Sequence, residues 1–424
     1  MGLAPNQSRR ELKGGARLLT ASLPDRASAS LVLMFKVGSR FEEDRIGGIS
    51  HFVEHLFFKG TPKRPTAKAI AEAIEGVGGW MNASTDKEVT VYLCRVTSDR
   101  LGLAADVLCD IVSNSQLAPS DIERERMVIL EELKMYLDQP QDYVHSLFER
   151  IMWPDHPLGR DIIGTMESVS GTSRDDLTSY VRGHYGLPNL VVGLAGAVDV
   201  DGAPELLESR LALPESLNGI ELTAPSTLER PTVFLQRKDT EQAHICLGTR
   251  GVSYHDPDRF AVDLLNTILG QGMSSRLFLE IREKRGLAYD VHSYASQHMD
   301  GGYFAVYMGV DPAKAEEALA GVQEELRRIS EHLVPEEELT KAKEFKKGSL
   351  RLSLESTTSL ASWLCQQELL MGELRTVEEV IALVESIQAE DLRRVARRVL
   401  DQPLQLAMIG PFQSDAPFRT AVGA

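Results

Sequence analysis

Hydrophobic positions along the chain gather into short strand-like runs, and the same order of elements occurs twice. Near the start, the runs ARLLTASLP and ASLVLMFKVGSR precede a polar loop and an apolar helix. Past the middle, PTVFLQRKD and AHICLGTRGVSY again precede a loop and an apolar helix, Arg259–Leu269. Because the strand runs come in adjacent pairs, they predict mainly antiparallel sheets with helices packed on one face.

The later parts of the two halves also correspond. Each half continues with a second pair of strand-like runs, two long helical patterns and a closing strand, LVVGLAGAV or LQLAMIGPF. The segment around 216–230 contains Pro, Ser and Thr and lacks periodicity, which is typical of a linker. The sequence therefore predicts the α+β class with two similar domains, 1–215 and 231–424, joined by a linker at 216–230.

Composition narrows the class of protein further. A chain of 424 residues is too long for one ordinary core, and 43% hydrophobic with 25% charged residues is typical of a soluble protein. The net charge of −16 argues against a nucleic-acid partner. The four cysteines form no CxxC pair, the N-terminus has no apolar h-region of a secretory signal, and no apolar run is long enough for a membrane span. We expect a cytoplasmic protein with reduced thiols and no membrane partner.

One apolar helix, ISHFVEHL, carries three ionisable side chains. His51 and His55 are four residues apart, so they lie one turn apart on the same helical face. Neutral imidazole is a good zinc ligand, and a catalytic zinc usually takes three protein ligands and a water. Glu54 points about 60° to the side of His51, near enough to reach that water. A lone buried histidine is more often a satisfied core residue, but this His-x-x-Glu-His spacing favours a metal site and matches the inverzincin signature.

The third ligand has to come from another element, and an acidic helix at 120–138 is the obvious source. It carries four glutamates beside one apolar stripe. Glu131 lies opposite the stripe, whereas Glu125 and Glu132 share its shoulder and are the two that can look into a pocket. A solvated surface charge is the ordinary interpretation of a helical glutamate, and we keep it for Glu123 and Glu131.

With these residues the chain resembles the pitrilysin or insulinase family of zinc peptidases. In that family HxxEH is followed about 76 residues later by a glutamate that completes the zinc site, and 76 residues lie between His55 and Glu132 here. The resemblance implies one zinc per chain, held by His51, His55 and Glu132, with Glu54 as general base. Glu125 matches a second glutamate that supports the catalytic site. The size resembles the two-domain branch that includes the mitochondrial processing peptidase beta subunit and its bacterial relatives.

The resemblance also implies how a substrate is held. Asn82 and Ala83 match positions on an edge strand that pairs with an extended peptide, a mode that recognises shape more than sequence. Arg282 and Tyr289 match a pair that holds the substrate backbone opposite the zinc in a clam-shell chamber, which we expect to be shared between two chains.

The expected protein is thus a zinc metalloendopeptidase for unfolded peptides or protein extensions, active as a homodimer, with a heterodimer as an alternative. A rival interpretation is a non-catalytic or partner-dependent subunit of a processing-peptidase-like complex. The intact HxxEH and Glu132 argue against it.

Overall fold

The computed structural model describes residues 3–215 and 222–424, so positions 216–221 of the expected linker lie outside the described part. Contacts divide the chain into two compact units. The first unit comprises the described parts of Met1–Met135 and Arg160–Leu222 together with Arg351–Thr376. The second unit comprises Tyr136–Gly159, Thr223–Leu350 and Val377–Ala424. Each unit therefore takes a segment from the other half of the sequence, and the continuous division at 215 and 231 stays a prediction.

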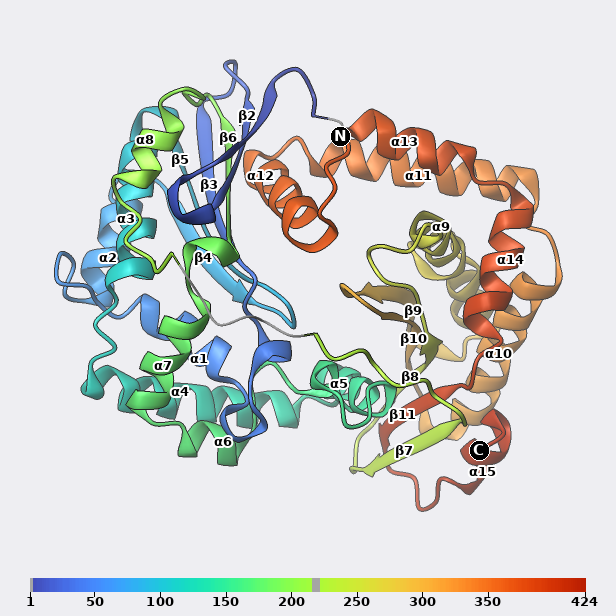
Figure 1. Cartoon of the computed structure of the whole chain (residues 1–424). Coiled ribbons are helices and arrows are strands. Elements are labelled where there is room, and N and C mark those ends of the chain that lie inside the picture. Colours follow the sequence, from blue (N-terminus) through green and yellow to red (C-terminus); the bar gives the residue numbers. More distant parts are fainter. Residues whose placement is uncertain (1–2, 216–221) are drawn as a thin grey trace. The chain divides into compact units, whose positions relative to one another are not determined.

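A six-stranded sheet forms the centre of the first unit (Figure 1). Its spatial order is β1-β2-β6-β3-β5-β4, and every neighbouring pair is antiparallel except β2 and β6. The strands are β1 (Gln7–Glu11), β2 (Arg17–Ser22), β3 (Ser28–Phe35), β4 (Trp80–Thr85), β5 (Thr90–Thr97) and β6 (Leu190–Gly196). Strand β4 lies at the edge of this sheet, which becomes important for the site.

The helices of the first unit cover both faces of this sheet. They are α1 (Ile49–Phe57), α2 (Ala67–Glu75), α3 (Leu101–Asn114), α4 (Pro119–Asp138), α6 (Met166–Gly171), α7 (Arg174–His184), α8 (Ala203–Glu208) and α12 (Thr357–Gln366). Alternate residues of β3 enter two different cores: Leu31 and Leu33 pack with α1 and α3, while Val32 packs with α12. Burial on both faces explains why β3 reads as a continuous apolar run.

The second unit contains a five-stranded sheet in the order β7-β11-β8-β10-β9, again with one parallel pair, β7 and β11. Its strands are β7 (Thr232–Arg237), β8 (Ala243–Arg250), β9 (Ala288–Gln297), β10 (Gly302–Val310) and β11 (Gln405–Gly410). Its helices are α5 (Pro140–Met152), α9 (Arg259–Gly270), α10 (Ala315–Glu331), α11 (Glu336–Ser353), α13 (Val377–Ser386), α14 (Ala389–Leu400) and α15 (Ala416–Val422). The prediction of two similar α+β domains with mainly antiparallel sheets is confirmed.

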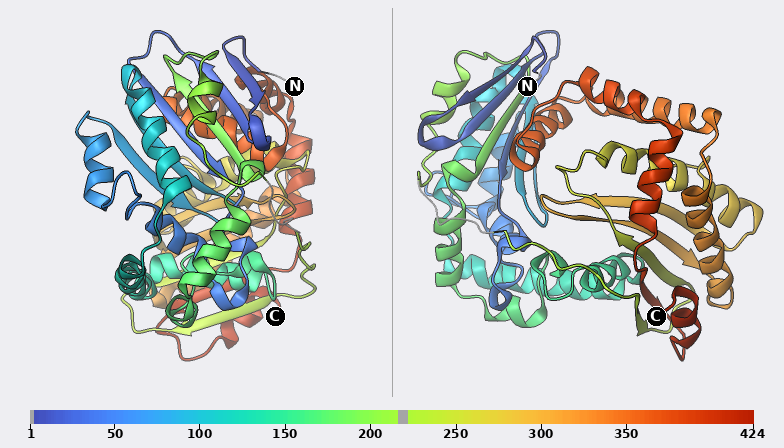
Figure 2. Two further views of the ribbon diagram at one scale, coloured as in Figure 1. Left: turned by 60° about the vertical axis from the view of Figure 1, so that its left-hand side comes forward. Right: turned by 45° about the vertical axis from the view of Figure 1, so that its right-hand side comes forward.

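Each sheet has one face covered by a helix from the other half of the sequence. Helix α12 packs on β2, β3 and β6 of the first sheet, as Figure 1 and the right-hand view of Figure 2 show. Helix α5 packs on β8 and β11 of the second sheet, where Val144 and Phe148 join a core with Cys246. This exchange was not foreseen from the sequence, because an apolar strand does not tell which helix covers it.

Two further features bear on the expected environment. All four cysteines are buried free thiols, as expected for reduced residues. Among the described residues, no helix is both long enough and apolar enough to cross a bilayer.

Candidate active site

Helix α1 is anchored firmly at its start. It begins after Gly48, whose φ of +91° is left-handed and whose absent side chain leaves room for the Ile163 carbonyl; a Cβ there would lie 2.6 Å from that oxygen. The buried Glu42 carboxylate accepts hydrogen bonds from the backbone N–H groups of Gly48 and Ser50, at 2.7 and 2.8 Å. The side chain of Glu42 therefore satisfies donors that the helix start would otherwise leave unpaired.

The apolar side of α1 holds the helix in the core and turns the polar side chains outward from it. Phe52, Val53 and Leu56 are fully buried in the first-unit core. His51 and His55 keep side-chain exposures of only 13% and 22%. The ring nitrogens of the two histidines converge, with 3.2 Å between their Nε2 atoms.

Glu132 of α4 completes this group. Its Oε2 lies 3.9 Å from Nε2 of His51 and 3.8 Å from Nε2 of His55. Two ligands at zinc bond lengths in a tetrahedron lie ~3.3–3.5 Å apart, so these separations are close to those of a metal site. His51, His55 and Glu132 form the one group of metal-ligating side chains of this kind in the part of the chain that the structure describes.

The chemistry of the donor set also fits a metal. Burial and the neighbouring His55 lower the pKa of His51 to about 4, so its imidazole is neutral near pH 7. Two neutral imidazole nitrogens that face each other make at most one hydrogen bond between them. A cation between the two facing Nε2 atoms gives both lone pairs a partner, as a zinc site requires.

The four glutamates of α4 face the two directions that their helical phase predicted. The side chains of Glu123 and Glu131 are 70% and 62% exposed and pair with Arg126 and Lys134 on the same helix. Glu132 is half exposed and reaches the histidines. Glu125 is buried, and its Oε2 lies 3.2 Å from Nδ1 of His55. A carboxylate in that position orients a metal-binding imidazole.

Glu54 lies beside the metal group and is held by a residue from another element. Its Oε2 accepts a hydrogen bond from the Thr85 hydroxyl at 2.5 Å, and Thr85 ends strand β4. Burial raises the pKa of Glu54, and the Thr85 hydrogen bond partly opposes that rise. A raised pKa makes a carboxylate a stronger base, which suits proton transfer near neutral pH.

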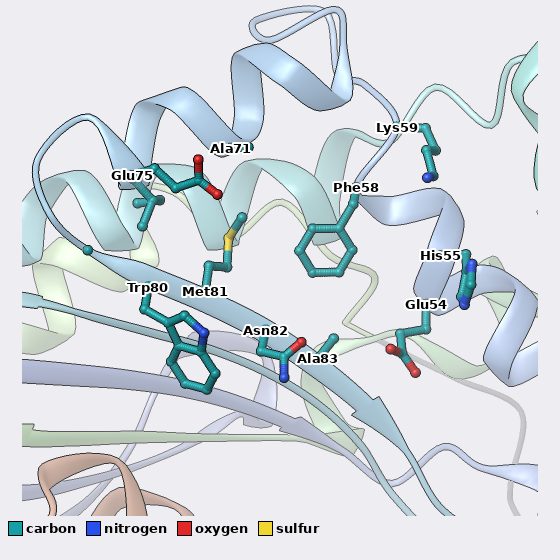
Figure 3. Close-up of a pocket in the computed structure, with 12 residues that line it drawn as sticks. Glu54, His55, Phe58, Lys59, Ala71, Glu75, Trp80, Met81, Asn82 and Ala83 are labelled. Atoms are coloured by element: carbon teal, nitrogen blue, oxygen red, sulfur yellow. The ribbon is translucent and has the colours of Figure 1, made fainter.

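A pocket of 360 Å³ opens next to Glu54 and His55 (Figure 3). Phe58, Ile74 and Met81 contribute apolar walls, and Glu75 and Trp80 lie toward the far end. All the lining residues come from α1, α2, strand β4 and the chain segments that adjoin them. The pocket is large enough for an amino-acid side chain.

The predicted substrate residues Asn82 and Ala83 line the same pocket. They lie on β4, which pairs with β5 on one side and is at the sheet edge on the other. An exposed edge of this kind can accept an extended peptide as a further strand.

Arg282 and Tyr289 lie together in the second unit. Arg282 belongs to a short π-helix, Phe278–Lys284, and its guanidinium carbon lies 5.2 Å from the ring centre of Tyr289. The Tyr289 ring is 73% exposed, so the pair is available to a ligand. Their part in substrate binding stays a prediction.

Sequence reasoning missed two residues of the first-unit site. Thr85 holds Glu54, and Lys59 pairs with Glu125 at 2.8 Å between Nζ and Oε1. The sequence gives only a weak indication that Lys59 belongs to the site, namely its position four residues after His55. Thr85 lies on the same strand as Asn82 and Ala83. Its partner, Glu54 on α1, is evident only from the structure.

Two family models match most of the chain. The insulinase model (peptidase family M16) matches residues 17–166, and a model described as the peptidase M16 inactive domain matches residues 172–345. The sequence contains HxxEH in the first of these ranges and not in the second.

Similar proteins align with nearly the whole length of this chain. An uncharacterized zinc protease of Streptomyces coelicolor is 40% identical over 96% of this chain and 90% of its own, and one of Bacillus subtilis is 35% identical over 94% and 97%. The crystal structure of a protease from Helicobacter pylori superposes with a TM-score of 0.91 at 24% identity, covering 96% of this chain and 100% of that one, which shows the same fold.

Proposed function

The chain belongs to the insulinase family of zinc peptidases, family M16, and on that premise we propose that it is an endopeptidase acting on unfolded peptides. The observation that carries this proposal is the convergence of His51, His55 and Glu132 beside Glu54. The 360 Å³ pocket and the free edge of β4 adjoin the same group.

His51, His55 and Glu132 are the residues that would hold one zinc ion per chain. Bound zinc supplies Lewis-acid chemistry at this position. Glu54 accepts a proton from the attacking water at its carboxylate and passes that proton to the leaving amine. Thr85 holds one oxygen of Glu54, and Glu125 holds Nδ1 of His55.

The substrate lies along the edge of β4 in this proposal. Main-chain groups near Asn82 and Ala83 pair with the peptide, and one substrate side chain enters the pocket beside Phe58 and Met81. Recognition through the main chain and one apolar-walled pocket suits extended, unfolded segments, because a folded substrate cannot offer a free strand.

We further propose that the active form is a homodimer in which Arg282 and Tyr289 of a second copy contact the substrate. The support is the proximity of this exposed pair to each other and the resemblance described above. If the chain instead works only in a heterodimer, or is a non-catalytic subunit, the purified chain alone is expected to hydrolyse no peptide.

The test is metal analysis combined with peptide hydrolysis for the native chain and Glu54→Gln. We expect one zinc per chain in both proteins and a hydrolysis rate about 10²–10⁴-fold lower in the variant. Glu131→Gln is the matched control, since its carboxylate is exposed and pairs with Lys134 on the same helix, α4. Undiminished hydrolysis by Glu54→Gln would contradict the proposed mechanism. A native chain without zinc would contradict the proposed zinc site.

A further inference from the structure

We infer that Lys59 is a positioning residue for the zinc ligand His55 and acts through Glu125. This inference rests on the proposed zinc site and concerns how that site is held in shape. Neither the HxxEH spacing nor Glu132 involves Lys59, which lies just beyond the end of α1 and close to His55 (Figure 3).

The Glu125 carboxylate bridges the lysine and the histidine. Its Oε1 lies 2.8 Å from Nζ of Lys59, and its Oε2 lies 3.2 Å from Nδ1 of His55. The Glu125 side chain is only 5% exposed, and that of Lys59 is 26% exposed. Each oxygen of the carboxylate thus has its own partner, and water has little access to the carboxylate.

The arrangement determines which nitrogen of His55 faces the metal group. An ionised carboxylate only accepts hydrogen bonds, so Nδ1 of His55 donates to Glu125 and the lone pair of Nε2 is free. That Nε2 is the atom nearest to His51 and Glu132. The ammonium of Lys59 balances the buried negative charge, which would otherwise be costly to keep next to the ligand.

An ordinary surface ion pair is the alternative explanation for Lys59, and the chain provides a matched comparison. Lys63 pairs with Asp106 at 2.6 Å, but the two side chains are 58% and 29% exposed. Asp106 also has a second cation, Arg64, and is not part of the group His51, His55 and Glu132. Lys63→Met therefore removes a comparable charge in the same segment without changing the support of His55.

The experiment measures zinc affinity by competition with a chromophoric chelator at one fixed pH. We expect Lys59→Met to bind zinc about 10–100-fold more weakly than the native chain, the range for losing an outer partner of a metal ligand. Lys59→Arg keeps the charge and is expected to restore most of the affinity. Lys63→Met is expected to bind zinc as the native chain does.

A double variant tests the route through Glu125. In the Glu125→Gln background, Lys59→Met is expected to cause little further loss, because the charge that it balances is already gone. An equal loss in both backgrounds would show that Lys59 acts by another route and would overturn the inference. Native-like affinity in Lys59→Met would overturn it as well.

Folding and the zinc site itself are controlled separately. Thermal unfolding of each zinc-free variant establishes that affinity is compared between folded chains, and Lys59→Arg tests the charge if Lys59→Met is destabilised. A native chain that binds no zinc contradicts the proposed function. A native chain that binds zinc, with Lys59→Met equally tight, contradicts only the role of Lys59.

Discussion

Helices α1 and α4 of the first unit and helices α9 and α11 of the second take the same places in the order of elements, yet they carry different chemistry. Helix α1 follows β3 as α9 follows β8, and α4 and α11 are each the second long helix after the edge hairpin. In the first pair, His51, His55 and Glu132 point ligand atoms at one another. The two imidazole Nε2 atoms can make only one hydrogen bond with each other.

In the second pair the polar side chains face groups of opposite charge or complementary hydrogen-bonding character. Asp263 of α9 lies 4.0 Å from Nζ of Lys346 on α11. The Asn266 amide oxygen accepts a hydrogen bond from the Ser293 hydroxyl at 2.6 Å. A carboxylate that already has an ammonium partner needs no metal ion. The same arrangement of sheet and helices thus carries a group of potential metal ligands in one unit and a 4.0 Å ion pair in the other, depending on a few facing residues.

The largest expected effect breaks the metal group directly. His51→Ala removes one of the three proposed ligands, so we expect zinc content and peptide hydrolysis both to fall to background. The matched change in the second pair, Lys346→Met, removes its ion pair and is expected to leave zinc content unchanged. Zinc content after dialysis and hydrolysis of an unstructured peptide are the measurements. Zinc loss in Lys346→Met would show that the two regions are not independent.

A smaller effect is expected from Thr85, which holds the proposed general base Glu54. Thr85→Val removes the hydroxyl that donates to Glu54. A hydrogen bond to a charged group contributes about 1.5–3 kcal/mol, so kcat is expected to fall about 10–100-fold. KM and zinc content should stay near native values, because the substitution keeps the main chain of β4 that would pair with substrate and touches none of the proposed ligands. Thr85→Ser keeps the hydroxyl, and an equal loss of kcat in Thr85→Ser would contradict this role.

A partly buried histidine of the second unit, His145, is expected to make stability depend on pH independently of any metal. Burial lowers the pKa of His145, and its Nδ1 lies 2.6 Å from the Tyr294 hydroxyl. An unfolded histidine has a pKa of about 6.5, so below that pH the unfolded chain binds a proton that the folded protein does not. The free energy of unfolding therefore falls as the pH drops through about 6.5 towards the lowered pKa.

His145→Gln should remove this contribution. The slope of unfolding free energy against pH is expected to decrease by at most about 1.36 kcal/mol per pH unit. Urea unfolding of the zinc-loaded chain between pH 7 and pH 5 is the measurement. A variant with the native slope would contradict the prediction, and a change in zinc content would contradict the separation of the two regions.

The smallest expected effect comes from comparing two neighbouring glutamates of α4. Glu131 and Glu132 are adjacent, but Glu131 faces solvent and pairs with Lys134. Glu131→Ala is expected to change the free energy of unfolding by no more than about 0.5 kcal/mol and to leave zinc affinity unchanged. Glu132→Ala is expected to abolish tight zinc binding. Equal behaviour of the two variants, measured by chelator competition, would contradict the assignment of Glu132 as a ligand.

Much of the site was predictable because it depends on local helical geometry. His51, Glu54 and His55 lie within about one turn, so their spacing alone places them on neighbouring faces. The phase of α4 separated Glu125 and Glu132 from Glu123 and Glu131, and the structure has the same separation. Thr85 and Lys59 escaped notice because their partners, Glu54 and Glu125, lie 31 and 66 positions away in the sequence.

The fold, like the site, was predictable only in its local features. Paired apolar runs predicted two similar α+β domains with mainly antiparallel sheets, since strand periodicity and short connections are local properties. They did not predict that α5 and α12 would each cover a sheet assembled mostly from the other half of the sequence. Burial on both faces of β3 requires a second apolar layer, but any amphipathic helix of suitable length can supply it.

By itself, the sequence determined the class of chemistry: two histidines and a glutamate at helical spacing, with a distant glutamate of the right phase. The tertiary structure decided which side chains support that chemistry, by placing Thr85 on Glu54 and Glu125 between His55 and Lys59. The physical reason is that helical spacing follows from the backbone of a few consecutive residues. Contacts between separate elements depend instead on how their apolar faces pack.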